Sequence, residues 1–140
     1  MRSARTTSRF GERGAYVDSS AFVKLVLVES ESAAMRETLR RTSFASSMVI
    51  VTEFMRTTVR DAPDRMQDAV ALLDAVTTVP LTRRLVVEAG RLPAPIVRAL
   101  DAIHIATALR LQPHVRPFLT YDERQATVAR ALGLDVVSPT

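Results

Sequence analysis

Short apolar blocks and amphipathic blocks alternate along the whole chain. Runs rich in β-branched and aromatic residues predict strands at 15–17, 43–45, 76–80, 117–120 and 135–137. Between them, apolar residues spaced three and four apart predict helices over 21–28, 32–41, 46–60, 65–75, 83–92, 101–109 and 122–132. Strands that alternate with helices indicate right-handed βαβ units. The pattern therefore predicts an α/β fold with helices on both faces of a short, mostly parallel sheet.

Polar residues mark where several of these helices begin and end. Ser20 is the predicted N-cap of helix 21–28, either Ser46 or Ser47 that of helix 46–60, and Thr82 that of helix 83–92. Gly133 predicts a left-handed C-cap for the last helix. Two faces are expected to be buried: nearly all of 101–109, and in 65–75 the side formed by Met66, Ala69, Val70 and Leu73.

Composition excludes several classes of protein. The 140 residues include no cysteine, which rules out disulfides, zinc–thiolate sites and cysteine nucleophiles and fits a reducing cytoplasm. The longest uncharged run, residues 42–52, is far shorter than the roughly 18 residues of a membrane-spanning helix. Residues 1–14 hold four arginines and one acid, so they account for +3 of the net charge of +4. We expect a disordered basic arm over 1–14 and a single domain over 15–140.

Four acids stand next to sequence that should be buried. Asp18 ends the first strand, Asp122 follows the fourth, Asp101 lies in the first turn of the most apolar helix, and Glu53 lies within an apolar helix. Each has a simple structural interpretation when taken alone. Asp101 and Asp122 could be helix caps, Asp18 a turn residue bonded to Ser20, and Glu53 a partner for polar residues one turn on.

Taken together, the four acids favour a ligand site. Ligands of open α/β sheets bind beyond the carboxyl ends of the strands. Two carboxylates about 5 Å apart repel by roughly 3 kcal/mol at an effective dielectric constant of about 20, so four of them require protons or a cation. Oxygen ligands without thiolate or histidine select a hard ion, Mg²⁺ or Mn²⁺. Ions held in this way commonly act on phosphates.

Three stretches of the sequence resemble the PIN-domain ribonucleases, and more narrowly the VapC-type toxins of toxin–antitoxin pairs. They are Tyr16–Ala21, the run Leu100–Leu109 with its Asp-Ala-Ile-His-Ile-Ala-Thr-Ala core, and Leu119–Arg124 together with Leu132–Leu134. The resemblance spans about residues 15–140 and implies a PIN-like three-layer α/β/α fold. An N-terminal arm of 14 residues is longer than usual in the family.

The resemblance also implies roles for individual residues. The family's acidic quartet falls on Asp18, Glu53, Asp101 and Asp122. Asp18 and Asp101 would bind Mg²⁺ or Mn²⁺ directly, whereas Glu53 and Asp122 would bind the ion or orient its water. Ser20 and Thr120 match hydroxyl positions that support these ligands.

Two further polar residues have less specific interpretations. His104, one turn after Asp101, could be a general base, but a packed histidine bonded to backbone or to Asp101 is favoured. Arg124 could contact a substrate phosphate or be a solvated helix charge.

The family's activity would be hydrolysis of RNA phosphodiesters by a cytoplasmic endoribonuclease. Its products would carry a 5′-phosphate and a 3′-hydroxyl. The partners implied are an RNA substrate, a cognate VapB-type antitoxin and a second copy of the chain in a homodimer, with no membrane. Two alternatives remain open: a catalytically silent PIN-like module that binds RNA or protein, and a phosphoacceptor receiver domain. The receiver interpretation is poorer, because Lys24, the single lysine, lies in the first predicted helix.

Overall fold

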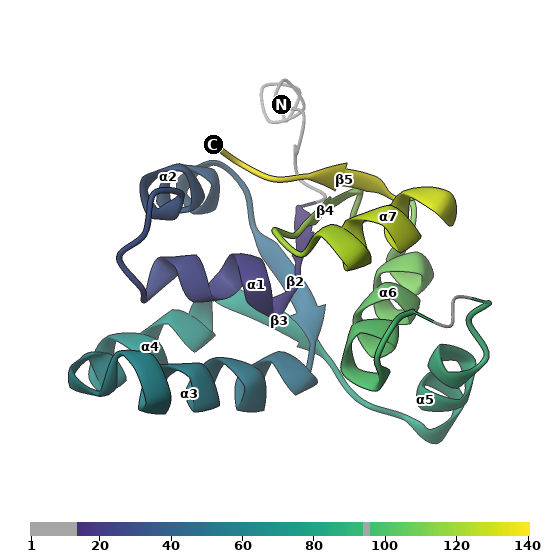
Figure 1. The fold of residues 1–140 in the computed structure, drawn as a ribbon, viewed down its shortest axis with the longest axis horizontal. Helices are drawn as coiled ribbons and strands as arrows, with labels where there is room; N and C mark the ends of the chain where they lie inside the picture. The colour runs from purple at the N-terminus through teal and green to yellow at the C-terminus, as the bar shows by residue number, and fades with distance from the viewer. Residues whose placement is uncertain (1–13, 94–95) are drawn as a thin grey trace, which may run out of the picture.

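A five-stranded parallel sheet forms the centre of the molecule (Figure 1). The computed structural model describes residues 14–93 and 96–140, so the predicted arm lies, apart from Gly14, outside the described residues. The strand order is β3-β2-β1-β4-β5. The strands are β1 (Ala15–Val17), β2 (Phe44–Ser47), β3 (Val76–Val79), β4 (Pro117–Leu119) and β5 (Asp135–Val137).

Helices cover both faces of this sheet, as the sequence predicted. They are α1 (Ser19–Phe22), α2 (Ser32–Arg41), α3 (Val49–Asp61), α4 (Met66–Leu72), α5 (Arg83–Gly90), α6 (Ala99–Leu111) and α7 (Glu123–Ala131). Short 3₁₀ turns at Val23–Leu25, Pro63–Arg65 and Leu73–Ala75 continue or join them. None of the helices in the described part of the chain is long and apolar enough to span a bilayer.

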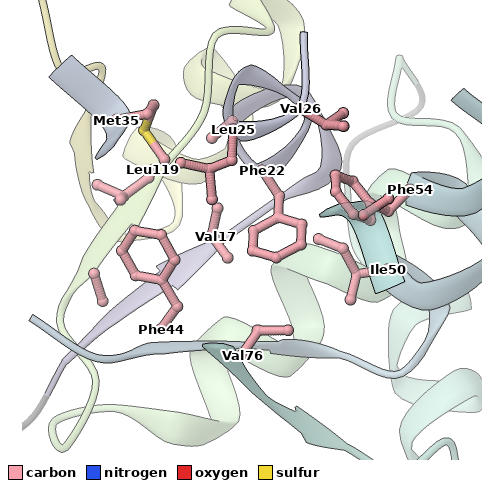
Figure 2. Packing of buried hydrophobic residues seen from close by; sticks show 13 residues of the cluster. Val17, Phe22, Leu25, Val26, Met35, Phe44, Ile50, Phe54, Val76 and Leu119 are labelled. Atoms are coloured by element: carbon pink, nitrogen blue, oxygen red, sulfur yellow. The ribbon is translucent and has the colours of Figure 1, made fainter. Parts of the chain in front are cut away.

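The alternation of side chains along the central strand separates two cores. Ala15 and Val17 pack on the face covered by α1 to α4, while Tyr16 points to the face covered by α6 and α7. On the first face the rings of Phe22 and Phe54 lie 4.6 Å apart, centroid to centroid (Figure 2). Helix α5 packs outside α6 in a third cluster. The structure is thus the expected α/β/α sandwich.

The first helix differs from its prediction at both ends. Its N-cap is Asp18 rather than Ser20, since an Asp18 carboxylate oxygen accepts the Ala21 backbone N–H. Ser20 lies inside the helix, where its hydroxyl donates to the same carboxylate and accepts the Tyr121 backbone N–H. The predicted span also ends early, because the chain passes through a 3₁₀ turn after Phe22 and leaves Val28 86% exposed.

The serines predicted to cap helix 46–60 belong instead to strand β2. The Ser46 hydroxyl donates to the backbone carbonyl of Val17 in the neighbouring strand, and Ser47 still accepts the Val49 N–H. Val70 is 55% exposed, so its predicted burial is wrong. The predicted caps at Thr82 and Gly133 are confirmed, and Gly133 has a φ of 94°.

Candidate active site

Strands β1 and β4 are adjacent at the centre of the sheet, where the chain changes its direction of winding. Their register pairs Tyr16 with Phe118 and Val17 with Leu119. Asp18 and Thr120 therefore leave the sheet side by side at its carboxyl edge. Ligand sites of open α/β sheets form at such a switch point.

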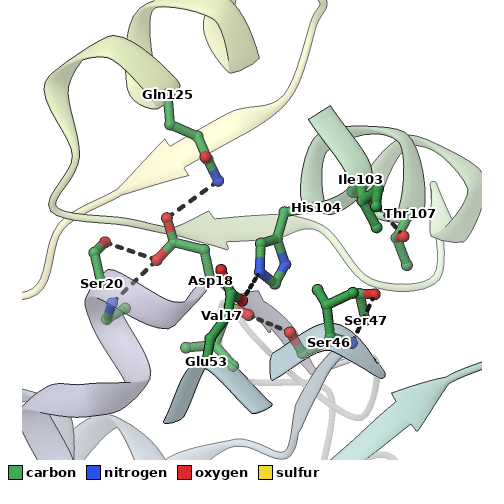
Figure 3. A network of polar contacts seen from close by, with 12 residues as sticks. Val17, Asp18, Ser20, Ser46, Ser47, Glu53, Ile103, His104, Thr107 and Gln125 are labelled. Carbon is green, nitrogen blue, oxygen red and sulfur yellow. Dashed lines mark hydrogen bonds and ion pairs between the residues drawn. The ribbon is translucent and has the colours of Figure 1, made fainter. Parts of the chain in front are cut away.

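The Asp18 carboxylate is buried at this edge, with 3% of the residue exposed. One oxygen accepts from the Ser20 hydroxyl at 2.7 Å and from the Ala21 N–H at 3.0 Å. The other accepts from the Thr120 hydroxyl at 2.5 Å. It also accepts from the Gln125 side-chain amide at 3.1 Å (Figure 3). Burial nevertheless raises the pKa of Asp18 to about 6. Removal from water destabilises the carboxylate more than these hydrogen bonds stabilise it.

Glu53 and His104 form a second polar cluster on the other side of Asp18. His104 Nε2 lies 2.7 Å from Glu53 Oε1, and His104 Nδ1 lies 2.6 Å from the Tyr16 hydroxyl. The Tyr16 oxygen in turn accepts the Ser47 backbone N–H at 3.0 Å. The sequence interpretation of His104 as a packed histidine is confirmed, but its partners are Tyr16 and Glu53 rather than backbone or Asp101.

An open cleft of about 740 Å³ lies above these clusters and is lined by three of the four predicted acids. Glu53 comes from α3, Asp101 from the first turn of α6, and Asp122 from the N-cap of α7, where it accepts the Gln125 backbone N–H. Asp101 is not a helix cap, because Arg98 occupies the N-cap of α6. The cap interpretation thus holds for Asp122 and fails for Asp101.

The pKa of Asp101 is affected by its burial and by the charges of the other acids in the cleft. Burial raises its pKa first, and the nearby charges of Asp122 and Glu53 raise it further. His104 and Arg98 oppose that shift. Arg98 and Arg124 also line the cleft, so two guanidinium groups border the three acids.

The structure therefore brings Glu53, Asp101 and Asp122 to one cleft and places Asp18 beneath it. Ser20 and Thr120 both bind Asp18 directly, as expected of supporting hydroxyls. Within residues 14–93 and 96–140, no three acidic or histidine side chains are close enough together to enclose a metal ion.

Sequence reasoning missed Gln125 and Tyr16. Gln125 is 1% exposed, although its position in the last helix gave no sign of burial apart from the four-residue spacing to buried Ala129. Tyr16 could have been found by alternation, since it points to the opposite face from its neighbours Ala15 and Val17.

The chemistry of the acids in the cleft, although not their spacing in this structure, fits a hard divalent ion. The three lining acids offer only oxygen atoms. Burial and then the charges of Asp122 and Glu53 raise the pKa of Asp101, and a cation relieves repulsion of this kind. Asp18 differs, because each of its oxygens already accepts two hydrogen bonds.

Fold and site together define an α/β domain with an acidic cleft at the switch point of its sheet. The PIN domain model matches residues 15–131. Ribonuclease VapC46 of Mycobacterium tuberculosis is 36% identical over 126 residues, covering 89% of this chain and 97% of its own length. Ribonuclease VapC47 of the same species is 33% identical over 130 residues, with 89% and 96% covered.

A solved structure has the same fold at lower sequence identity. It is the crystal structure of M. tuberculosis VapC20, described as a sarcin–ricin-loop-cleaving toxin. It superposes with a TM-score of 0.70 at 16% identity and covers 89% of this chain and 99% of its own. The chain belongs to the PIN-domain family and, within it, to the VapC-type ribonucleases.

Proposed function

We propose that this chain is a divalent-metal-dependent endoribonuclease and the toxin of a toxin–antitoxin pair. The observation that supports this most directly is the cleft that Glu53, Asp101 and Asp122 line together with Arg98 and Arg124. Carboxylates alone would repel the phosphates of an RNA backbone, so a cation is required for RNA to bind at the acids of the cleft. When bound, Mg²⁺ or Mn²⁺ would activate a water and stabilise charge at the scissile phosphate.

The chain's own residues divide the remaining work. Asp101, with Glu53 and Asp122, would hold the ion, and Asp101 is already the site of mutual repulsion. Asp18 supplies negative charge from below, and its direct ligation would require one of its four donors to leave. Arg98 and Arg124 would bind phosphates on either side of the cut and fix the strand across the cleft.

The partners follow from the VapC-type relatives. We propose a VapB-type antitoxin that covers the cleft, a homodimer that sets two clefts side by side, and action in the cytoplasm. Ile96 and Leu100 line the cleft and are 56% and 46% exposed, so they offer apolar contact surface to an antitoxin segment. Co-expression with the product of the adjacent reading frame should yield an inactive complex.

Cleavage of purified RNA tests the proposal. The wild-type protein should cut RNA in Mn²⁺ or Mg²⁺, leave 5′-phosphate and 3′-hydroxyl ends, and stop cutting in EDTA. Asp101→Asn and Glu53→Gln should abolish cleavage, while Asp64→Asn, an exposed acid outside the cleft, should not. Cleavage that survives EDTA or Asp101→Asn would contradict the metal-dependent mechanism. RNA binding without any cleavage by the wild type would favour the silent-module alternative.

A further inference from the structure

A chain of buried hydrogen bonds runs from the sheet to the cleft. It begins at the Ser47 N–H, passes through the Tyr16 hydroxyl and both ring nitrogens of His104, and ends at the Glu53 carboxylate. Tyr16 and His104 are each 1% exposed, whereas the Glu53 side chain is 16% exposed and lines the cleft. The chain therefore joins three separate elements, β2, β1 and α6, to one solvent-facing carboxylate on α3.

The donors and acceptors favour one direction for each hydrogen bond. The Tyr16 oxygen already accepts the Ser47 N–H, and we assign its own proton to the 2.6 Å contact with His104 Nδ1. Nδ1 is then the acceptor, so the ring carries its proton on Nε2 and donates it to Glu53 at 2.7 Å. The opposite tautomer would turn a nitrogen lone pair toward the carboxylate oxygen and leave the phenol proton facing an N–H.

The surroundings of Tyr16 keep this arrangement in place. Burial raises the pKa of the Tyr16 phenol, so the hydroxyl keeps the proton that it donates. The Tyr16 ring stacks on Phe118 with centroids 5.3 Å apart and an interplanar angle of 7°. It also meets the His104 ring edge-on at 5.7 Å. The ring contacts of Tyr16 thus fix the position of its hydroxyl, and these contacts do not themselves involve the hydroxyl group.

Packing alone does not explain this pair. A buried polar group costs stability unless every hydrogen bond is made, and an aliphatic side chain would fill the position of His104 without that requirement. The one end of the chain that reaches solvent is the Glu53 carboxylate.

We propose that His104 and Tyr16 are positioning residues of the nuclease: Tyr16 selects the Nε2–H tautomer of His104, which holds the Glu53 carboxylate in the cleft. This inference rests on the proposed function, because it concerns how Glu53 is presented to the ion. Partners that orient a metal ligand typically contribute about 10–100-fold to metal affinity or activity.

Two substitutions of similar size separate positioning from packing. In His104→Gln the side-chain amide reaches about as far as Nε2 and can still donate to Glu53, whereas His104→Leu packs but cannot donate. Gln and Leu have similar helix propensities, so α6 is not the difference. We expect the Mn²⁺ dissociation constant, measured by the EPR signal of free Mn²⁺, to rise about tenfold or more in His104→Leu. It should stay nearer to wild type in His104→Gln.

The kcat of RNA cleavage should also fall more in His104→Leu than in His104→Gln. KM for RNA should change little, because Glu53 does not bind the RNA strand. A packing role predicts the reverse, with Leu at least as good as Gln in both measurements, and that result would overturn the proposal.

The tautomer itself can be observed without any metal or substrate. The chain has two histidines, and exposed His114 serves as an internal reference for the ¹⁵N ring signals. In the wild type, His104 should show a protonated Nε2 and an unprotonated Nδ1. In Tyr16→Phe, which keeps the ring stack, only Glu53 still favours the Nε2–H form, so this preference should weaken and Mn²⁺ affinity should fall. An Nδ1–H tautomer in the wild type, or a Tyr16→Phe protein with unchanged tautomer and unchanged affinity, would contradict the role of Tyr16.

These results also separate the inference from the function on which it rests. If Glu53→Gln and Asp101→Asn cut RNA normally, the proposed nuclease site is wrong. If both are inactive but His104→Leu matches the wild type in Mn²⁺ affinity and kcat, only the positioning role is wrong.

Discussion

The Thr120 hydroxyl donates to the Asp18 carboxylate at 2.5 Å, although 102 residues separate the two in the chain. The contact joins the carboxyl ends of β1 and β4, which pair in parallel at the centre of the sheet. The same hydroxyl oxygen accepts the Asp122 backbone N–H at 3.0 Å. Thr120 thus links the buried acid of the site to one of the acids that line the cleft.

Removal of this hydroxyl should destabilise the protein. Thr120→Val keeps the shape and β-branching but leaves an Asp18 oxygen and the Asp122 N–H each short of a partner. A hydrogen bond to a charged buried group contributes about 2 kcal/mol, so urea unfolding should show a loss of about that size. Thr120→Ser keeps the hydroxyl and should lose less. Equal stability of the Val and Ser variants would show that the contact contributes little.

The raised pKa of Asp18 makes the stability of the metal-free protein depend on pH. The folded-state pKa of about 6 lies above the ordinary value of 3.8, so the folded protein binds more protons between these values. The contribution of Asp18 is therefore fully present below about pH 4 and is lost as pH rises through about 6, by about 3 kcal/mol in all.

Asp18→Asn cannot titrate, so it isolates that contribution. In EDTA, the free energy of unfolding of the variant should gain on that of the wild type between about pH 4 and 6, then run parallel to it. Denaturant melts at several pH values measure the difference. A difference that stays constant from pH 4 to 8 would mean that Asp18 titrates normally in the folded state.

Local patterns in the sequence were enough to place the strands and most of the helices. The α/β/α layers follow from the alternation of strands with helices and from the βαβ rule. Helix ends were less predictable, because neighbouring polar residues can each cap a helix and contacts distant in the chain decide among them. Ser20 has the right residue type for an N-cap, yet its hydroxyl is bound to Asp18, and Asp18 takes the cap instead.

The gathering of acids at one edge of the sheet was predictable, but their arrangement was not. Depth could not be predicted, because whether Asp18 lines the cleft or lies beneath it depends on the helices packed around it. The partner of His104 was also unpredictable, since Glu53 lies 51 residues away on another helix. Glutamine is a residue type typical of solvated helix positions, but Gln125 is buried and its side-chain amide donates a hydrogen bond to the Asp18 carboxylate.

Neutralising Asp101 should have opposite effects with and without metal. Burial and the charges of Asp122 and Glu53 raise the pKa of Asp101. Asp101→Asn removes the partly buried charge and its repulsion, so it should raise the melting temperature slightly in EDTA at neutral pH. It also removes an oxygen charge that would hold the ion. Saturation at a hundredfold excess over Kd stabilises by about 2.7 kcal/mol, so Mn²⁺ should raise the wild-type melting temperature clearly.

The Mn²⁺-induced rise in melting temperature should shrink in Asp101→Asn. Glu37→Gln, which neutralises an exposed acid paired with Arg40 on α2, should keep the full rise. An unchanged rise in Asp101→Asn would exclude Asp101 from ion binding.

Arg98 and Arg124 should contribute to RNA binding rather than to the chemical step. Each arginine that contacts a phosphate displaces a counterion, so its loss weakens binding and reduces the slope of log K against log salt by about 1. We expect Arg98→Gln and Arg124→Gln to raise KM for RNA at moderate salt while kcat changes little. Arg84→Gln is the matched control, because Arg84 is exposed on α5 and lines a different groove. A loss of kcat at saturating RNA in Arg124→Gln, with an unchanged salt slope, would instead mean that this guanidinium stabilises the reacting phosphate, and Arg124 would then count among the catalytic residues.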